Sequence, residues 1–270
     1  MRGETLISVS TMKSLAVILV LVGNVFGGIA HRESERLQSM NSGRVVGGGP
    51  VTIESRPFAA SVQHQGVHRC GGTILNDDCI LTAAQCTVNI PDAVLSVRVG
   101  SAASQSGGQL FQVDYVDNHP NFNPITNAND LAVIHVIGHI HFGAAIQPIA
   151  MPAQGAGTPA GAIAAVSGWG SISEGGAFSP TLQSANVPVI TNGVCNQLFG
   201  GGIVDGMICA GFVEGGAGAC NGDNGSPLTF GNQVIGIVSR VEGCGRPNAP
   251  TVYTRVAYYR HWIDEHSYHH

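Results

Sequence analysis

The chain has 270 residues, of which 44% are hydrophobic and only 11% are charged, so it can bury a large core and is not of the disordered class. Its 12 Lys and Arg against 17 Asp and Glu give a net charge of -5, and no basic run stands out, so nucleic acid and anionic membranes are excluded as natural partners. The 38 glycines are spread along the chain, which is typical of an all-β fold with many tight turns.

The N-terminal segment, residues 1–30, has the sequence features of a secretory signal peptide. Lys13 precedes a short apolar core between Leu15 and Val22, and the small residues Gly28 and Ala30 offer a cleavage site. A membrane anchor is the alternative, but the apolar run is too short to span a bilayer comfortably. We therefore expect a secreted, extracellular protein.

Residues 31–44 are polar and charged, unlike the chain that follows them. They end at the basic residue Arg44, and the apolar stretch Val45-Val46-Gly47-Gly48 comes next. This pattern predicts a propeptide over 31–44 that is cleaved after Arg44, with a plain linker as the alternative. The folded domain is then expected over 45–270.

From residue 45 onward the sequence shows short β-type runs, rich in β-branched residues and separated by Gly, Pro, Asn and Asp. Examples are residues 59–62, 80–83, 95–99, 131–134 and 234–238. The last segment differs, because Tyr259 and Ile263 lie four residues apart, as do Tyr258 and Trp262. That spacing predicts an amphipathic C-terminal helix.

Eight short motifs occur in a fixed order along the chain. They are VVGG at Val45, CGGTIL at Cys70, LTAAQC at Leu81, NDLAVI at Asn129, SGWG at Ser167, MICAG at Met207, GDNGSP at Gly222 and VYTRV at Val252. With these motifs the chain resembles the trypsin/chymotrypsin family of secreted serine proteases from about residue 44 to 267. The resemblance implies an all-β fold of two six-stranded antiparallel β-barrels, with the active-site cleft between them and a C-terminal α-helix.

Seven cysteines in a secreted chain are candidates for disulfides, and the odd count leaves at least one outside any internal pair. The resemblance implies the pairs Cys70–Cys86, Cys195–Cys209 and Cys220–Cys244. Cys79 is left over, just before an apolar run. We expect it to be a buried free thiol that acts as a small hydrophobe, with a disulfide to another chain as the alternative.

Acyl transfer in this family needs an oxygen nucleophile, a base that takes its proton, and a carboxylate that orients the base. By resemblance, the carboxylate position holds Asp130, the histidine position holds Gln85 and the serine position holds Asn224. A primary amide accepts no proton near neutral pH and forms no stable acyl-enzyme. Two of the three roles are therefore empty, although the backbone amides of Gly222 and Asn224 would still form the oxyanion hole.

Ser226 is the hydroxyl that could replace the missing nucleophile, with His64 or His68 as its base. It stands at a structural glycine position, however, and Gln85 leaves no base beside it. Asn224-Gly225-Ser226 also forms a glycosylation sequon. A glycan that caps the cleft is a hypothesis that requires Asn224 to be exposed.

The resemblance also identifies the substrate pocket. Its base is Gly218, where trypsin-like enzymes carry Asp, and its walls include Val241 and Thr251, where open-pocket members have glycine. Branched side chains shorten the pocket, so small substrate side chains are favoured. Ser239 and Val241 offer a backbone edge to an extended peptide.

The residues of the family's activation switch are present. In the family, cleavage after the residue at Arg44 frees the amine of Val45, which inserts and pairs with the carboxylate at Asp223 to order the cleft. The freed amine could still order a binding surface in this chain. Simple inheritance from an active ancestor is the alternative.

We expect no cofactor and no metal, because the 11 histidines lack Cys or carboxylate partners at ligand spacing and residues 100–112 contain no carboxylate for calcium. The sequence predicts a secreted serine protease homologue without peptidase activity, a pseudoprotease. It would bind a protein or peptide ligand, such as a protease or a protease inhibitor, as a regulator, cofactor or decoy. The alternatives are an endopeptidase with an atypical active site and a structural or storage protein.

Overall fold

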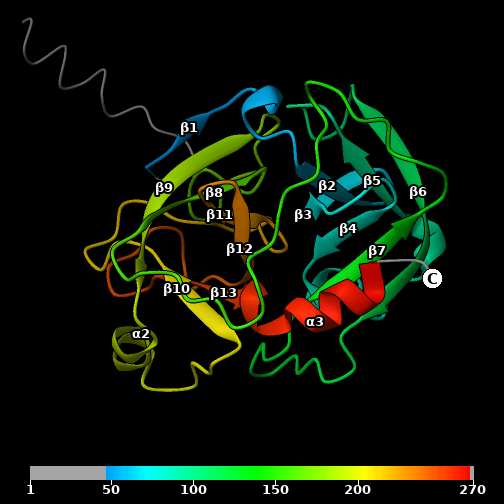
Figure 1. Ribbon diagram of the computed structural model, residues 1–270. Helices are drawn as coiled ribbons and strands as arrows, with labels where there is room; N and C mark the ends of the chain where they lie inside the picture. The colour runs from blue at the N-terminus through cyan, green and yellow to red at the C-terminus, as the bar shows by residue number, and fades with distance from the viewer. Residues whose placement is uncertain (1–46, 268–270) are drawn as a thin grey trace, which may run out of the picture. The chain divides into compact units, whose positions relative to one another are not determined.

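The computed structural model describes residues 47–267, so the predicted signal peptide, the predicted propeptide, Arg44 and Val45 lie outside the described part. The described residues form two antiparallel β-barrels (Figure 1), the first from blue to green and the second from yellow-green to red. The predicted all-β fold with two six-stranded barrels is thereby confirmed.

The first barrel closes in the order β2-β3-β4-β7-β6-β5. Its strands are β2 (Ala59–His64), β3 (Val67–Ile74), β4 (Cys79–Thr82), β5 (Leu95–Val99), β6 (Gln109–Asn118) and β7 (Ala132–Val136). Gln65 and Gly66 both have positive φ between β2 and β3, the backbone that a two-residue hairpin turn requires. Four of the predicted β-runs lie in this barrel, because their branched side chains pack inside it.

The second barrel runs β9-β10-β13-β12-β11-β8 and closes through the pairing of β8 with β9, while the short strand β1 adds to the edge of β9. The strands are β1 (Gly49–Pro50), β8 (Ile163–Gly168), β9 (Gln183–Ile190), β10 (Met207–Ala210), β11 (Pro227–Phe230), β12 (Gln233–Arg240) and β13 (Thr251–Arg255). The predicted run 234–238 lies within β12, which is also confirmed.

Two α-helices lie within residues 47–267, α2 (Asn192–Phe199) and α3 (Val256–Ser267), together with the 3-10 helices η1 (Ile53–Ser55), η2 (Ala84–Cys86) and η3 (Asp92–Val94). The predicted C-terminal helix is α3, whose Tyr259 and Ile263 pack into the core of the first barrel. Helix α2 was not predicted, although Thr191 caps its N-terminus and Gly200 ends it at φ +70. No helix in the described part is long and apolar enough to cross a membrane.

The three implied disulfides are present, Cys70–Cys86, Cys195–Cys209 and Cys220–Cys244, and Cys79 is a buried free thiol. The first bond ties β3 to η2, and the third ties the loop before β11 to the loop after β12. Gln85 on η2 and Asn224 in the loop before β11 line the cleft, so these two disulfides limit the movement of the candidate site.

Candidate active site

The three predicted catalytic positions meet where the two barrels join. Gln85 lies on η2, which the Cys86 disulfide anchors, and Asp130 lies two residues before β7. Asn224 comes from the loop before β11 in the second barrel, and its carbonyl accepts a hydrogen bond from the amide of Gly71 in the first barrel at 2.8 Å. The loops of both barrels therefore build one site.

A continuous chain of hydrogen bonds links these positions. The backbone amide of Gln85 donates to Asp130 Oδ1 at 2.9 Å, and Gln85 Nε2 donates to Asp130 Oδ2. At the other end of the same side chain, Gln85 Oε1 accepts from Asn224 Nδ2 at 3.1 Å. The order carboxylate, Gln85, Asn224 is the order that the resemblance implies for carboxylate, base and nucleophile.

The neighbouring groups determine which way each amide points. A carboxylate and a backbone carbonyl accept hydrogen bonds only, so the NH₂ group of Gln85 must face Asp130 and the carbonyl of Ser239. Its oxygen then faces Asn224, which presents its own NH₂ group. Both side chains are thus held as neutral donors and acceptors, and neither offers a basic nitrogen or an ionisable nucleophile.

Asp130 is fully buried and takes donors from both barrels. Ser239 Oγ donates to its Oδ2 at 2.6 Å, and Thr254 Oγ1 donates to its backbone carbonyl at 2.6 Å. Burial raises the pKa of the Asp130 carboxyl, while the hydrogen bonds from Ser239 and Gln85 oppose that shift. The carboxylate acts here as an acceptor that orients Gln85.

The carbonyl of Ser239 is already saturated. It accepts from Gln85 Nε2 at 2.6 Å and from Asn224 Nδ2 at 2.9 Å, which uses both of its lone pairs. The backbone edge predicted at Ser239 and Val241 is therefore partly occupied by the substituted side chains themselves. A peptide that pairs with this edge must first displace one of the two amides.

The predicted oxyanion amides belong to Gly222 and Asn224. Among residues 47–267, neither of these N–H groups donates to a protein acceptor. The carbonyl of Gly222 contacts His68 Nε2 at 3.1 Å, and a Cβ on Gly222 would lie 2.7 Å from the ring of Phe178. Glycine is required at this position, which also has φ +92.

Ser226 does not form a nucleophile–base pair with either histidine. Its side chain is fully buried beside Gly71 and Gly168, and within the described residues its hydroxyl has no hydrogen-bond partner. The ring of His68 is engaged by Ser61 Oγ at 2.8 Å, and burial lowers the pKa of His68 to about 4. His64 lines the cleft cavity instead.

The same burial disfavours the glycan hypothesis. Asn224 Nδ2, the atom that would carry the sugar, donates two hydrogen bonds, and the hydroxyl of the sequon residue Ser226 is inaccessible. Asn224 is half-buried and lines the cleft, but in the folded chain its bonded amide and the buried Ser226 hydroxyl make the sequon a poor acceptor.

The arrangement of barrels, disulfides and catalytic positions agrees with the comparison to known families, in which the model of the family "Trypsin" matches residues 45–263. The chain belongs to the trypsin family.

Several curated relatives cover most of the chain. The vitellin-degrading protease of Bombyx mori is 38% identical over 224 residues, which is 82% of this chain and 85% of that protein. Trypsin 5G1 of Aedes aegypti is 37% identical over 228 residues, with 83% and 85% covered. Trypsin delta of Drosophila melanogaster is 38% identical over 257 residues, with 93% and 98% covered.

None of the residues predicted to form the substrate pocket of this trypsin-family domain lines the cleft cavity. Gly218 approaches Thr251, since a Cβ on Gly218 would lie 3.4 Å from Thr251 Oγ1. Val241 follows the end of β12 and packs against the core of the second barrel. The open part of the cleft is a cavity of about 370 Å³, lined by His64, Val67, His68, Arg69, Cys70, Gln85, Phe178 and Asn224.

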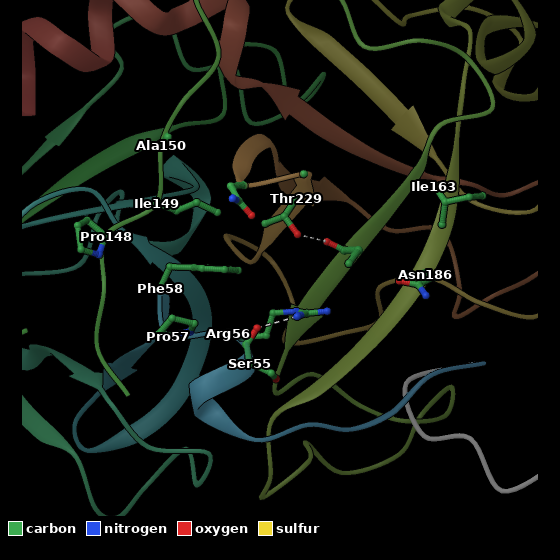
Figure 2. Close-up of a pocket in the computed structure, with 13 residues that line it drawn as sticks. Ser55, Arg56, Pro57, Phe58, Pro148, Ile149, Ala150, Ile163, Asn186 and Thr229 are labelled. Atoms are coloured by element: carbon green, nitrogen blue, oxygen red, sulfur yellow. Dashed lines mark hydrogen bonds between the residues drawn. The ribbon is translucent and has the colours of Figure 1, made fainter. Parts of the chain in front are cut away.

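A second cavity, of about 560 Å³, is larger than the cleft and contains none of the predicted site residues (Figure 2). Arg56, Phe58 and Thr229 are among its lining residues. The guanidinium of Arg56 is held by Ser167 Oγ at 3.1 Å and by the carbonyl of Ser55 at 2.7 Å. Its lining includes hydroxyls but no His, Cys, Asp or Glu that could act as a base or thiol nucleophile, so we assign the candidate active site to the smaller cavity.

The predicted activation carboxylate, Asp223, is buried and precedes Asn224 in the loop before β11. Its oxygens accept from the amide of Gly170 at 2.8 Å and from the amide of Cys220 at 2.9 Å. A Cβ on Gly170 would lie 2.4 Å from the Asp223 carboxyl carbon, so only glycine fits there. Burial raises the pKa of Asp223 to about 6 despite these two donors.

The buried hydroxyl of Ser226 provides a stability test. An unsatisfied buried hydroxyl costs about 1–3 kcal/mol, so Ser226→Ala is expected to raise the free energy of unfolding by about 1 kcal/mol. Urea unfolding followed by fluorescence measures this change. The matched control is Ser61→Ala, which removes a bonded hydroxyl and should lower stability by a similar amount. A Ser226→Ala variant as destabilised as the control would contradict the assignment.

The raised pKa of Asp223 predicts a pH dependence of stability in the uncleaved chain. Between pH 4 and pH 6 the folded protein keeps a proton that the unfolded chain has released, so stability falls as pH rises through this window. The full shift corresponds to about 3 kcal/mol. The test is urea unfolding of the natural chain and of Asp223→Asn at several pH values from 4 to 6.5. The free energy of unfolding of the natural chain minus that of the variant should fall across this range by up to that amount. A difference that stays constant across the window would refute the prediction.

Proposed function

We propose that this chain is a secreted trypsin-family protein without peptidase activity, which acts by binding a protein or peptide ligand as a regulator, cofactor or decoy. The observation that supports this proposal is the amide chain in the cleft. Gln85 and Asn224 occupy the positions of base and nucleophile and bond to each other and to Asp130. Neither amide can take a proton from a hydroxyl and return it, and Gln85 stands between Asp130 and the nucleophile position.

The loss of rate that follows is large. In a protease with the same triad on another fold, removal of the base or the nucleophile lowers turnover by about 10⁶-fold, and removal of more members adds little. Oxyanion donors and binding alone leave only about 10³–10⁴-fold acceleration over water. The amides of Gly222 and Asn224, which donate to no protein acceptor among residues 47–267, are consistent with such a residual effect, which is negligible for digestion or processing.

The named relatives are proteases, and the alternative function for this chain is an endopeptidase with an atypical nucleophile. That alternative needs a hydroxyl or thiol within reach of a base at the cleft. Ser226 fails this requirement because it is fully buried, and Cys79 lies on β4 outside the cleft lining. The hydroxyls of Ser61 and Ser239 do contact a base, His68 and Asp130 respectively, but both serines are buried and neither lines the cleft. We therefore favour binding over an alternative catalytic route.

The proposal includes the maturation route expected for the family. The signal peptide over 1–30 would direct secretion, and cleavage after Arg44 would free the amine of Val45. The Asp223 carboxyl accepts hydrogen bonds from the amides of Gly170 and Cys220, and Gly170 has no side chain that would clash with it. Maturation would then order a binding surface rather than a catalytic one.

The decisive experiment is a turnover assay on protein cleaved after Arg44, with a broad peptide library as substrate. The natural chain is expected to release no product above background. The Gln85→His, Asn224→Ser, Ser226→Gly variant should recover peptidase activity, because it restores base, nucleophile and the glycine beside them.

The control for contamination is Asn224→Ala, which cannot contribute a nucleophile. If the natural chain cleaves peptides and the activity survives both repurification and Asn224→Ala, the proposal is wrong and a different nucleophile operates. If only the triple variant cleaves peptides, the residues at these three positions account for the absence of activity in the natural chain, and the proposal is supported.

Binding at the cleft can be measured separately with an extended peptide that carries small side chains. The natural chain should bind it weakly, and Asn224→Ala should bind it up to about 10-fold more tightly, because one lone pair of the Ser239 carbonyl is freed for the peptide. Isothermal titration measures both affinities. Asn232→Ala, at the second cavity, is the control and should match the natural chain. Absence of binding in all three proteins would favour a structural or storage role.

A further inference from the structure

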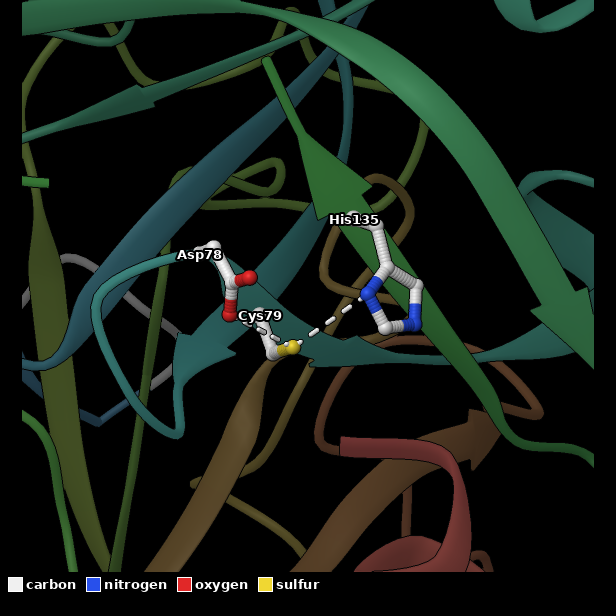
Figure 3. Close-up of side chains that lie close together, drawn as sticks. All are labelled: Asp78, Cys79 and His135. Carbon is white, nitrogen blue, oxygen red and sulfur yellow. Dashed lines mark hydrogen bonds between the residues drawn. The ribbon is translucent and has the colours of Figure 1, made fainter. Parts of the chain in front are cut away.

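A cluster of three potential metal ligands lies in the first barrel, outside the lining of the cleft. Asp78 and Cys79 stand at the start of β4, and His135 lies directly opposite Cys79 in the neighbouring strand β7. Cys79 Sγ is 3.0 Å from Asp78 Oδ1 and 3.4 Å from His135 Nδ1 (Figure 3). One ligand atom of each residue lies within 4.8 Å of the other two.

The donor set matches zinc. Thiolate, imidazole and carboxylate are the three ligand types that proteins offer to Zn²⁺, whereas calcium and magnesium prefer oxygen atoms alone. Tetrahedral bonds of about 2.1–2.3 Å place two ligand atoms about 3.6 Å apart. The sulfur-to-nitrogen distance of 3.4 Å is already close to that value, and the carboxylate has to move outward by only about 0.6 Å to match it.

His135 is positioned as metal-bound histidines usually are. Its Nε2 lies 3.4 Å from Asp117 Oδ2, so a proton on that nitrogen faces a carboxylate and leaves Nδ1 directed at Cys79. The ring also stacks on Tyr115, with centroids 4.1 Å apart and planes 11° from parallel. A carboxylate 3.4 Å from Nε2 favours a proton on that nitrogen, which is the tautomer that leaves Nδ1 for a metal.

The backbone around the cluster is held by Asn76. Its Oδ1 accepts from the amides of Asp78 at 3.1 Å and Cys79 at 2.7 Å, while its Nδ2 donates to the carbonyl of Ser267 at 2.6 Å. That carbonyl lies 3.4 Å from Cys79 Sγ. The end of α3 therefore borders the cluster, and the half-exposed Asp78 gives access from solvent.

We propose that Asp78, Cys79 and His135 form a zinc-binding site with Asp117 as the residue that positions His135. In the metal-free protein the thiol is neutral, because burial and the nearby Asp78 raise the pKa of Cys79. When the metal binds, a sulfur–metal bond forms and the thiol proton passes to the buffer. The carboxylate and the thiolate together balance the two positive charges, and the fourth position is left for water or the carbonyl of Ser267.

The proposed zinc site differs from our expectation from the sequence, which was that the chain binds no metal. That expectation considered ligand spacing along the sequence, where Cys79 and His135 are 56 positions apart. The pairing of β4 with β7 brings them into direct register. The inference does not depend on the proposed function, because none of these residues lines the cleft.

The probe for the test is Co²⁺, which replaces zinc in tetrahedral sites and gives a sulfur-to-cobalt charge-transfer absorption when a thiolate is bound. The full secreted protein, freed of metal by chelation and with its disulfides intact, is titrated with Co²⁺ and then with Zn²⁺. We expect the absorption to saturate at one Co²⁺ per chain and to disappear when Zn²⁺ is added. The midpoint of thermal unfolding should rise with Zn²⁺ and return after chelation.

Variants separate this site from other metal-binding groups. Cys79→Ala should abolish the charge-transfer band, and Asp117→Asn should keep the band but weaken Co²⁺ binding about 10- to 100-fold. The matched control is His139→Gln, because His139 is also paired with an aspartate, Asp77, at 3.0 Å but is exposed. It should bind Co²⁺ like the natural chain.

Two results would overturn the proposal. One is the absence of a sulfur-to-cobalt band in the natural chain when mass spectrometry shows the Cys79 thiol to be unmodified. The other is a Co²⁺ affinity that Cys79→Ala leaves unchanged, which would point to histidines elsewhere in the chain. If Cys79→Ala does not fold, equal affinities of Asp117→Asn and His139→Gln would likewise overturn it.

Discussion

The buried Asp130 is a charged group through which the two barrels are bonded to each other, in addition to the hydrogen bond from the Gly71 amide to the Asn224 carbonyl. It belongs to the chain entering β7 of the first barrel, yet Ser239 and Thr254 of the second barrel donate to its side chain and its carbonyl. Gln85 completes the set from η2. A charge at this depth is tolerated only when donors surround it, so the loops that carry these donors are held in one arrangement. The geometry of the cleft follows from that requirement.

Gln85 and Asn224 preserve this arrangement with side chains that carry neither a basic nitrogen nor a hydroxyl. An amide is long enough and polar enough to satisfy the carboxylate on one side and the neighbouring amide on the other. The network therefore keeps its hydrogen bonds through two amides that do not titrate near neutral pH. Stability of the site and catalysis by it are separable, because the first needs donors and acceptors and the second needs a proton to move.

The same two side chains also change what the cleft presents to a ligand. They donate to both lone pairs of the Ser239 carbonyl, so the protein's own side chains occupy part of the backbone edge that an extended peptide would bind. The space that remains borders His68 and Phe178 rather than Gly218 and Thr251. A partner that binds in this cleft meets the Arg69 guanidinium and a Ser239 carbonyl whose lone pairs are already used, which suits recognition by shape and charge more than by backbone pairing.

The sequence by itself indicated short β-strands and tight turns, since β-branched runs and turn residues are local features. The two barrels, the three disulfides and the leftover Cys79 were implied by the family resemblance that eight ordered motifs carry. The sequence also indicated that Gln85 and Asn224 cannot perform the roles of a base and a nucleophile, because that conclusion depends only on the chemistry of an amide. Only the tertiary structure decided which acceptors those amides bind, where the Ser226 hydroxyl is buried, and that His135 faces Cys79. These facts depend on the register between strands and on contacts between barrels, which join residues far apart in the chain and leave no periodic signal in it.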